Sequence, residues 1–215
     1  VSGQTYDRKI DAKVMALLSN IAQSAHKFTN DLRLLQNLKE IEEPFEKNQI
    51  GSSAMAYKRN PMRSERIGSL AKFVMSLSSS SAMVAATQWF ERTLDDSANK
   101  RLAIPQSFLA VDAILLIWNN IMNGIVVYEN RIHKHIMDEL PFMATEYIIM
   151  EEVKAGGDRQ EIHETNRVHS MEASKKVKQE GKENDLIGRI MNDASLKLDK
   201  SKLMEVLDPK NFIGF

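Results

Sequence analysis

The residues best suited to chemistry in this sequence lie in the segment GSSAMAYKRNP, at residues 51–61. Two adjacent hydroxyls, Ser52 and Ser53, are followed by the ammonium group of Lys58 and the side-chain amide of Asn60. An ammonium group and an amide can stabilise a carboxylate that gains negative charge during a reaction, and a serine can move a proton. The segment therefore predicts proton abstraction from an anionic substrate.

The same segment is also compatible with an ordinary turn between two helices. In that interpretation Gly51 supplies backbone freedom and Pro61 starts the next helix. Lys58, Arg59 and Arg63 would then be solvated surface charges. A turn has no need of hydroxyl, ammonium, guanidinium and amide groups together, and this redundancy favours the chemical interpretation.

Three apolar stripes indicate the helices that position this segment. In each stripe apolar residues recur at intervals of three and four, which is typical of a helix packed along its neighbours. The first contains Val14, Leu18, Ile21, Ala25, Phe28, Leu32 and Leu35. The second begins with Ile67, Leu70, Val74 and Leu77, and the third contains Phe108, Val111, Leu115, Trp118, Met122 and Ile125. We therefore predict an all-α protein built on a long helical bundle.

The stripes end near residue 129, and the elements beyond it are shorter. We expect a bundle domain over residues 1–129, which carries the loop at 49–63, and a smaller helical domain over residues 130–215. The chain starts at Val1 without a methionine and in mid-pattern, so we expect a fragment of a longer protein.

Two breaks are expected inside the bundle. The serine run at residues 78–81 predicts an interruption between helices. The polar segment RTLDDSANKR, at residues 92–101, predicts a second connection, in which Asp95 or Ser97 caps the next helix. Pro105 suits the first turn of a helix, so we expect the third long helix to begin there.

Composition excludes several kinds of site. The sequence has no cysteine, which excludes disulfides, thiolate metal sites and a cysteine nucleophile. Lys and Arg number 29, as do Asp and Glu, so no basic excess supports nucleic-acid binding. The most apolar run, residues 108–127, contains Asp112 and asparagines that would be costly in lipid, which predicts a buried helix. The absence of cysteine suits a reducing compartment and leaves the compartment open, and we expect no binding to nucleic acid or membrane.

The segment at residues 51–61 resembles the signature loop of the fumarase/aspartase superfamily, Gly-Ser-Ser-x-Met-Pro-x-Lys-x-Asn-Pro. Further segments, GQTYDRK, EEPFEKNQIGSSAM, QWFERTLDDSAN and ELPFMATEYIIM, are similar to adenylosuccinate lyases of the animal type. The resemblance covers nearly the whole chain. One departure is Ala56, where the pattern has proline; it removes no reacting group.

The resemblance implies an all-α homotetramer whose active sites are assembled from three chains, with no metal or cofactor. The implied reaction is β-elimination of fumarate from adenylosuccinate to give AMP, and from SAICAR to give AICAR. It also implies that Ser52 is the general base, and that Lys58 and Asn60 hold the succinyl carboxylates and the aci-carboxylate formed on deprotonation.

The resemblance further assigns residues to substrate binding. Arg92, Ser97 and Arg101 fall on positions that contact the nucleotide phosphate, and Gln4 and Arg66 fall on other substrate-contacting positions. Arginine forks and a hydroxyl suit phosphate oxygens. The resemblance implies that the acid is a histidine in a segment that precedes everything present here. We therefore interpret the five histidines as structural or surface residues and expect the fragment alone to be inactive.

Two alternatives stay open on the sequence. A sister enzyme such as argininosuccinate lyase shares the loop, although the segments YKRNPMRSER and FERTLDDSAN fit it less well. A helical scaffold that has kept the fold and lost activity is the second alternative. The presence of Ser52 and Lys58 speaks against that scaffold.

Overall fold

The computed structural model describes residues 3, 5–45, 55, 57–91 and 94–214. It divides into two compact units, Val1–Tyr128 and Glu129–Phe215. Across the described residues the regular secondary structure is helical, apart from two strands of two residues each. The prediction of an all-α protein is confirmed.

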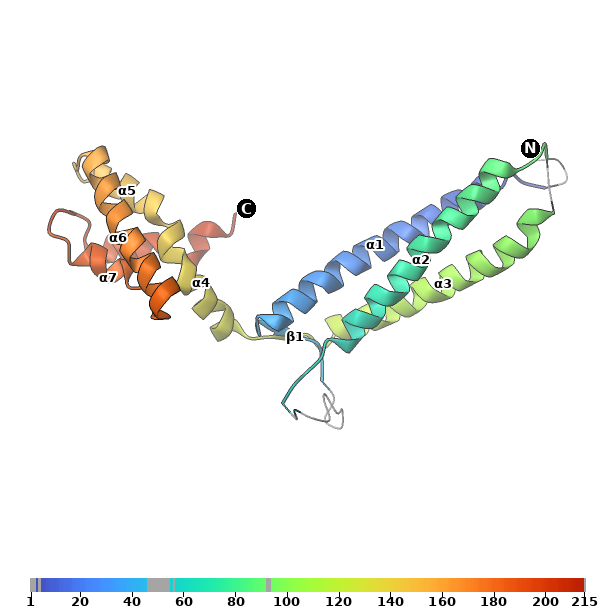
Figure 1. The fold of residues 1–215 in the computed structure, drawn as a ribbon, viewed down its shortest axis with the longest axis horizontal. Coiled ribbons are helices and arrows are strands. Elements are labelled where there is room, and N and C mark those ends of the chain that lie inside the picture. The colour runs from blue at the N-terminus through green and yellow to red at the C-terminus, as the bar shows by residue number, and fades with distance from the viewer. Residues whose placement is uncertain (1–2, 4, 46–54, 56, 92–93, 215) are drawn as a thin grey trace. The chain divides into compact units, whose positions relative to one another are not determined.

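The first unit is built on three long helices that lie side by side (Figure 1): α1 (Lys9–Asn37), α2 (Met62–Thr87) and α3 (Asp95–Met122). Small side chains lie at the centre of the packing; Ala22, Ala25 and Ala71 are fully buried. Larger residues complete the core: Met15, Leu18, Leu32, Ile67, Val74, Val111, Ile114 and Ile121. Small residues let helices approach closely, which allows the larger ones to fill the remaining space at native density.

The expected break at the serine run is wrong, and the expected connection at residues 92–101 ends earlier than predicted, because α2 ends at Thr87 and α3 already begins at Asp95. Helix α2 runs through the serine run, and serine hydroxyls there return to backbone carbonyls, as Ser79 Oγ does to Ser76 O at 2.8 Å. Ser81 is buried. Helix α3 begins at Asp95 and accommodates Pro105 in its interior, so most of the segment at residues 92–101 is helical.

The buried face of α3 also differs from the predicted stripe. Phe108, Leu115 and Met122 are exposed, whereas Ile114 and Ile121 are buried. Apolar residues occur around the whole circumference of this helix, so periodicity alone could not select the face that meets α1 and α2.

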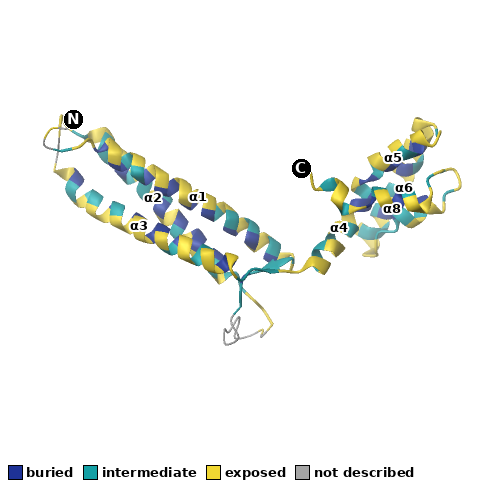
Figure 2. Ribbon diagram, turned by 180° about the vertical axis from the view of Figure 1, so that it is seen from behind, coloured by how far each residue is buried: buried dark blue, intermediate teal, exposed yellow. Residues whose placement is uncertain are grey.

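Several large apolar residues of the bundle helices are exposed, and Figure 2 shows exposed positions along the length of these helices. On α3 they include Leu102, Phe108, Leu109, Leu115 and Leu116. Helices α2 and α3 are long and apolar enough to cross a membrane by length and composition, with mean hydropathy of 1.2 and 1.5, and 28% of each window is buried inside the unit. Large apolar side chains exposed in this number favour an interaction site.

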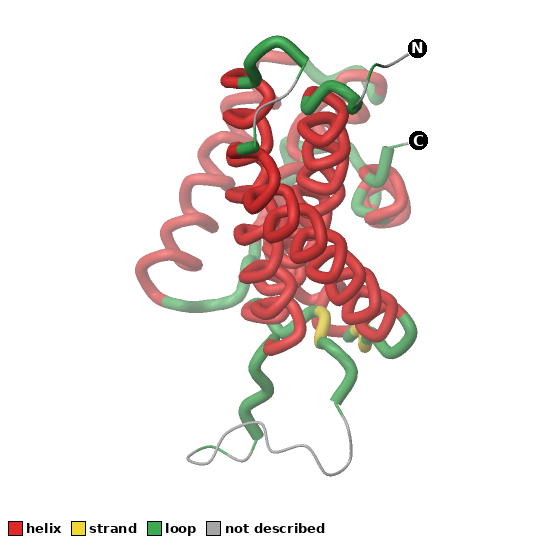
Figure 3. Tube along the Cα trace, turned by 90° about the vertical axis from the view of Figure 1, so that its right-hand side faces the viewer, coloured by secondary structure: helices red, strands yellow, loops and turns green. Residues whose placement is uncertain are grey.

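A small sheet closes one end of the bundle. Strand β1 (Ile41–Glu42) pairs antiparallel with β2 (Val126–Val127), in the register Ile41 with Val127 and Glu42 with Val126. Figure 3 shows the strands next to the segments that lead into the loop between α1 and α2. We call this end of the first unit, where β1, β2 and residues 57–61 lie, the loop end.

The second unit contains five shorter helices and a 3-10 turn. They are α4 (Glu129–Met143), α5 (Thr145–Lys154), α6 (Arg159–Glu180), α7 (Leu186–Met191), α8 (Lys200–Val206) and the 3-10 helix Pro209–Phe212. The Asp158 carboxylate accepts from the N–H groups of Gln160 and Glu161 and caps the start of α6. Gly181, at φ 64°, ends that helix in the left-handed conformation.

A buried carboxylate holds a loop of the second unit. Glu152, on α5, is 1% exposed and accepts from the N–H groups of Lys197 at 2.8 Å and Leu198 at 2.7 Å. These two bonds fix the segment that leads from α7 to α8, and they satisfy a charge that would otherwise be costly to bury.

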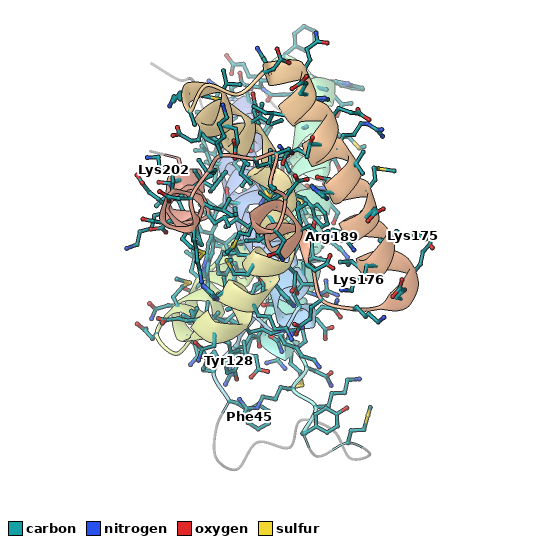
Figure 4. The ribbon with its side chains drawn as sticks, turned by 90° about the vertical axis from the view of Figure 1, so that its left-hand side faces the viewer. Phe45, Tyr128, Lys175, Lys176, Arg189 and Lys202 are labelled. Carbon is teal, nitrogen blue, oxygen red and sulfur yellow. The ribbon has the colours of Figure 1, made fainter. Side chains whose placement is uncertain are left out.

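Two further carboxylates of the second unit are held in their charged form. Asp185 accepts from Arg189 Nε at 2.8 Å and Lys176 Nζ at 2.7 Å (Figure 4), which lowers its pKa to about 2. Hydrogen bonds from Ser195 and then His169 lower the pKa of Asp193 to about 2. Because both pKa values lie below the ordinary value of 3.8, these groups stabilise the fold above about pH 4 and lose that contribution as the pH falls through 2.

The melting temperature of Asp185→Asn should therefore differ from that of the unaltered chain in a pH-dependent way. At pH 6 we expect it to be lower by about 2–4 °C, the shift that corresponds to about 1 kcal/mol in a chain of this size. The difference should shrink between pH 4 and pH 2, as the unaltered carboxylate becomes protonated. Calorimetry at several pH values measures it, with Glu183→Gln, an exposed position, as the control. A difference independent of pH would contradict the assignment.

Candidate active site

Lys58 and Asn60 lie at the loop end, in the segment that enters α2. The Lys58 side chain is exposed, and its backbone N–H donates to the carbonyl oxygen of Met55 at 2.9 Å, which forms a turn. Asn60 is half-buried, and its carbonyl oxygen accepts from the N–H of Met62 at 2.8 Å. Ser52 lies outside the described residues.

One acidic and two aromatic side chains lie near the segment at residues 57–61. Glu42 accepts from Arg59 Nη1 at 3.0 Å and from the Tyr128 hydroxyl at 2.8 Å. The guanidinium of Arg59 lies 4.8 Å from the centre of the Phe45 ring (Figure 4). The hydrogen bond to Glu42, followed by burial, raises the pKa of Tyr128, so this hydroxyl remains a donor. Glu42 thus links Arg59 to Tyr128, the last residue of the first unit.

Arg66 is on α2, one turn beyond its first residue, and is exposed. It follows Lys58 and Asn60 closely in the chain, so the structure places these three predicted residues at the same end of the bundle. A cation, an amide and a guanidinium at one end form a surface suited to carboxylates.

Ser97 and Arg101 lie at the other end, in the first two turns of α3. They are four residues apart and so share one face of the helix, with Ser97 half-buried and Arg101 exposed. The start of α3 is anchored through its neighbour Asp96, which pairs with the buried Arg8 at 3.1 Å. The Arg8 backbone N–H in turn donates to Gln88 Oε1 at 2.9 Å. Arg92 and Gln4 lie outside the described residues.

One chain does not bring the two groups together. Helix α2 has 26 residues, and at 1.5 Å per residue it separates the loop end from the start of α3 by about 39 Å. Figure 1 shows the start of α3 and the loop end at opposite ends of the bundle. Lys58, Asn60 and Arg66 therefore share an end with one another but not with Ser97 and Arg101.

The described residues contain no group of three or more His, Asp or Glu side chains suited to a metal ion. A hollow of about 600 Å³ lies on the second unit between α5 and α6, where its lining includes Lys154, Arg159 and His163. None of the predicted site residues lines it.

Sequence reasoning missed the residues that hold the loop segment, chiefly Gln36, Glu42 and Glu43. A sequence signal for one of them existed. Helix α2 follows Pro61, whose side chain offers no acceptor for the first N–H groups of the helix, so a side chain from elsewhere in the chain can take that place. The adjacent pair of glutamates just before Pro44 was the available source.

Comparison with known proteins identifies the relatives of this chain. The family model described as "Adenylosuccinate lyase C-terminus" matches residues 141–215, and that described as "Lyase" matches residues 2–76. The chain is 55% identical over 214 residues to the adenylosuccinate lyase of Saccharomyces cerevisiae and 53% identical to that of Schizosaccharomyces pombe; in each case the match covers 100% of this chain and 44% of the relative.

A solved structure shows the same fold. The fumarate lyase from Mesorhizobium sp. BNC1 superposes with a TM-score of 0.73 at 19% identity, over 97% of this chain and 45% of that one. The chain thus spans less than half the length of the curated relatives that it matches. With two family models matched in order along it and relatives above 50% identity over its whole length, the chain belongs to the adenylosuccinate lyase family.

Proposed function

We propose that this chain forms part of a lyase that eliminates fumarate from adenylosuccinate to give AMP, and from SAICAR to give AICAR. The observation that carries the proposal is the identity of 46–55% over the whole chain to relatives named adenylosuccinate lyase. These relatives do not favour argininosuccinate lyase or an inactive scaffold as the function. The substrates are small anions, so no nucleic acid or membrane is required, and we place the enzyme in the cytoplasm.

Each predicted residue has a step in this reaction. Ser52 takes the proton from the succinyl Cβ, and the electron pair of that C–H bond moves into the neighbouring carboxylate to form the aci-carboxylate. Lys58 and Asn60 stabilise this dianion, which lowers the barrier. The pair then returns to form the fumarate double bond as the C–N bond breaks. A group outside this chain protonates the departing nitrogen.

A serine needs help to act as a base, because its hydroxyl is weakly acidic at its free pKa. The cationic groups placed at the loop end, Lys58 and Arg66, favour the alkoxide through their charge. This is the same charge that the dianion requires, so one set of cations serves both the base and the intermediate.

We further propose a homotetramer in which each active site takes residues from more than one chain. The separation of about 39 Å between the loop end and the start of α3 prevents one chain from placing Lys58 and Arg101 on the same small substrate. An antiparallel sister helix would bring the second end to the first. The exposed apolar face of α3, which includes Phe108, Leu109 and Leu116, offers the surface for such packing.

The function can be tested in a chimeric enzyme. In it, these residues replace the matching 214 residues of the Saccharomyces cerevisiae relative, which supplies the remaining length. We expect turnover of adenylosuccinate, followed by the absorbance change as AMP forms. A folded, assembled chimera that turned over argininosuccinate instead, or neither substrate, would contradict the proposal.

Arg101→Ala in the chimeric enzyme should weaken AMP binding and leave fumarate binding nearly unchanged. Loss of a charge-assisted hydrogen bond to phosphate costs about 1.5–3 kcal/mol, or about tenfold to over a hundredfold in affinity. Arg101→Lys keeps the charge and loses the forked pair of donors. Its affinity for AMP should lie between that of Arg101→Ala and that of the unaltered enzyme. Calorimetric titration with each ligand measures the effect. Equal losses for AMP and fumarate would mean that this end of α3 is not a phosphate site.

A further inference from the structure

The segment that carries Lys58 and Asn60 is tied to the end of α1 by a buried amide. Gln36, in the last turn of α1, is 9% exposed. Its Nε2 donates to the carbonyl oxygen of Arg59 at 3.0 Å, and its Oε1 accepts from the N–H of Glu43 at 3.4 Å. The carbonyl that Gln36 holds therefore belongs to the residue between Lys58 and Asn60.

A buried carboxylate ties the other side of the same segment. Glu43 is 5% exposed; its Oε2 accepts from the N–H of Arg63 at 3.0 Å and its Oε1 from the N–H of Ser64 at 2.6 Å. These N–H groups belong to the first turn of α2 and have no acceptor within the helix. Their acceptor comes from 20 residues upstream and not from the segment that carries Lys58 and Asn60.

The two side chains form one connected unit, which we call the loop clamp. Gln36 holds Glu43 through its backbone, and Glu43 holds the start of α2 through its carboxylate. Arg63 adds a bond from its guanidinium to the carbonyl oxygen of Pro44. Residues 60–62 are thereby fixed on both sides, by a bond to residue 59 and by bonds to residues 63 and 64.

The start of α2 could have been capped by a short polar side chain, without burying a carboxylate. Burying a carboxylate is costly unless its oxygens are hydrogen-bonded, and a short cap at residue 60 or 61 would avoid that cost. The negative charge suits the positive end of the α2 dipole and makes both hydrogen bonds stronger than neutral ones. These bonds constrain the backbone next to Lys58 and Asn60, the residues assigned to charge stabilisation.

We infer that Gln36 and Glu43 are positioning residues for elimination: they set the places of Lys58 and Asn60 through the backbone and do not touch the substrate. The inference rests on the proposed function, because Lys58 and Asn60 take their roles from it. Misplacing a catalytic group by about 1 Å can cost about a hundredfold in rate, so a rigid clamp matters to kcat.

The chain supplies a matched control for this inference. Glu152 is also a buried glutamate whose two oxygens accept from consecutive backbone N–H groups, but it lies in the second unit. Substitution of Glu152 removes the same kind of interaction from the fold without altering the segment at residues 57–64.

The test compares Glu43→Gln, Gln36→Leu and Glu152→Gln in the chimeric enzyme. Glu43→Gln and Gln36→Leu should each lower kcat by about tenfold to a hundredfold. Their affinity for AMP, which we assign to the start of α3, should stay within about twofold of the unaltered value. Glu152→Gln should lower the melting temperature and leave kcat per folded enzyme within about twofold. Retention of kcat by Glu43→Gln and Gln36→Leu, or a loss no greater than that of Glu152→Gln, would overturn the inference.

A second measurement decides the inference independently of activity. In the 215-residue chain, Glu43→Gln should accelerate amide hydrogen exchange over residues 57–64, and Glu152→Gln should not. Unchanged exchange in Glu43→Gln would refute the clamp even if the enzyme were active. Absence of turnover in the unaltered chimera would instead count against the proposed function, and accelerated exchange would then still support the clamp.

Discussion

Ser52→Ala in the chimeric enzyme will lower kcat for fumarate elimination by about a hundredfold to ten-thousandfold, the usual contribution of a general base. Binding of adenylosuccinate should change little, because the hydroxyl contributes mainly in the transition state. Single-turnover kinetics and calorimetric titration separate the two quantities. The size of the effect follows from the weak acidity of the Cβ proton, which does not leave without a positioned base.

Ser53→Ala is the matched control for this substitution. It removes the neighbouring hydroxyl from the same loop, and we expect kcat to stay within about tenfold of the unaltered enzyme, below the range for loss of a general base. If Ser52→Ala kept a near-normal kcat and Ser53→Ala did not, the base would be Ser53, and the pattern of the signature loop would have misled the assignment.

Mixing two inactive variants should restore activity if each site combines residues from different subunits. Ser52→Ala removes the base at the loop, and Arg101→Glu repels phosphate at the start of α3. After the two chimeric enzymes are unfolded and reassembled together at equal amounts, about a quarter of the sites should contain both native residues, drawn from different chains. Turnover should rise from near background to about a quarter of the unaltered rate.

The control for this experiment pairs two substitutions in the same loop. Ser52→Ala mixed with Lys58→Ala should recover nothing, because both residues belong to one signature loop and reach a site from one chain. Recovery in this control, or no recovery from Ser52→Ala with Arg101→Glu in mixed tetramers verified by differential tags, would show that the sites are not shared in the proposed way.

The sequence by itself determined the helical class of this protein and the residues of its signature loop. Apolar spacing of three and four is a local property, so the stripes that begin at Val14 and Ile67 could be identified without any tertiary contact. The family was identifiable for a similar reason, because GSSAMAYKRNP is contiguous and its neighbours occur in order. The residues of the candidate site remain predictions made from this pattern.

Only the tertiary structure decided how the helices continue and which faces they bury. The serine run did not break α2, because the Ser79 hydroxyl returns to a carbonyl of the preceding turn and Ser81 is buried. Apolar residues occur around the circumference of helix α3, so its inward face followed from packing against α1 and α2 and not from periodicity. Local propensity cannot report either result, because both depend on packing partners distant in the chain.

The loop clamp and the separation of the site residues were also decided only by the tertiary structure. Glu43 reaches the amides of Arg63 and Ser64 across 20 and 21 residues, and no periodic pattern encodes such a contact. The resemblance assigned Lys58 and Arg101 to one substrate, while the length of α2 places them at opposite ends of the bundle within one chain. Residue types predict the chemistry, and the length of a helix, about 1.5 Å per residue, keeps these two residues apart within one chain.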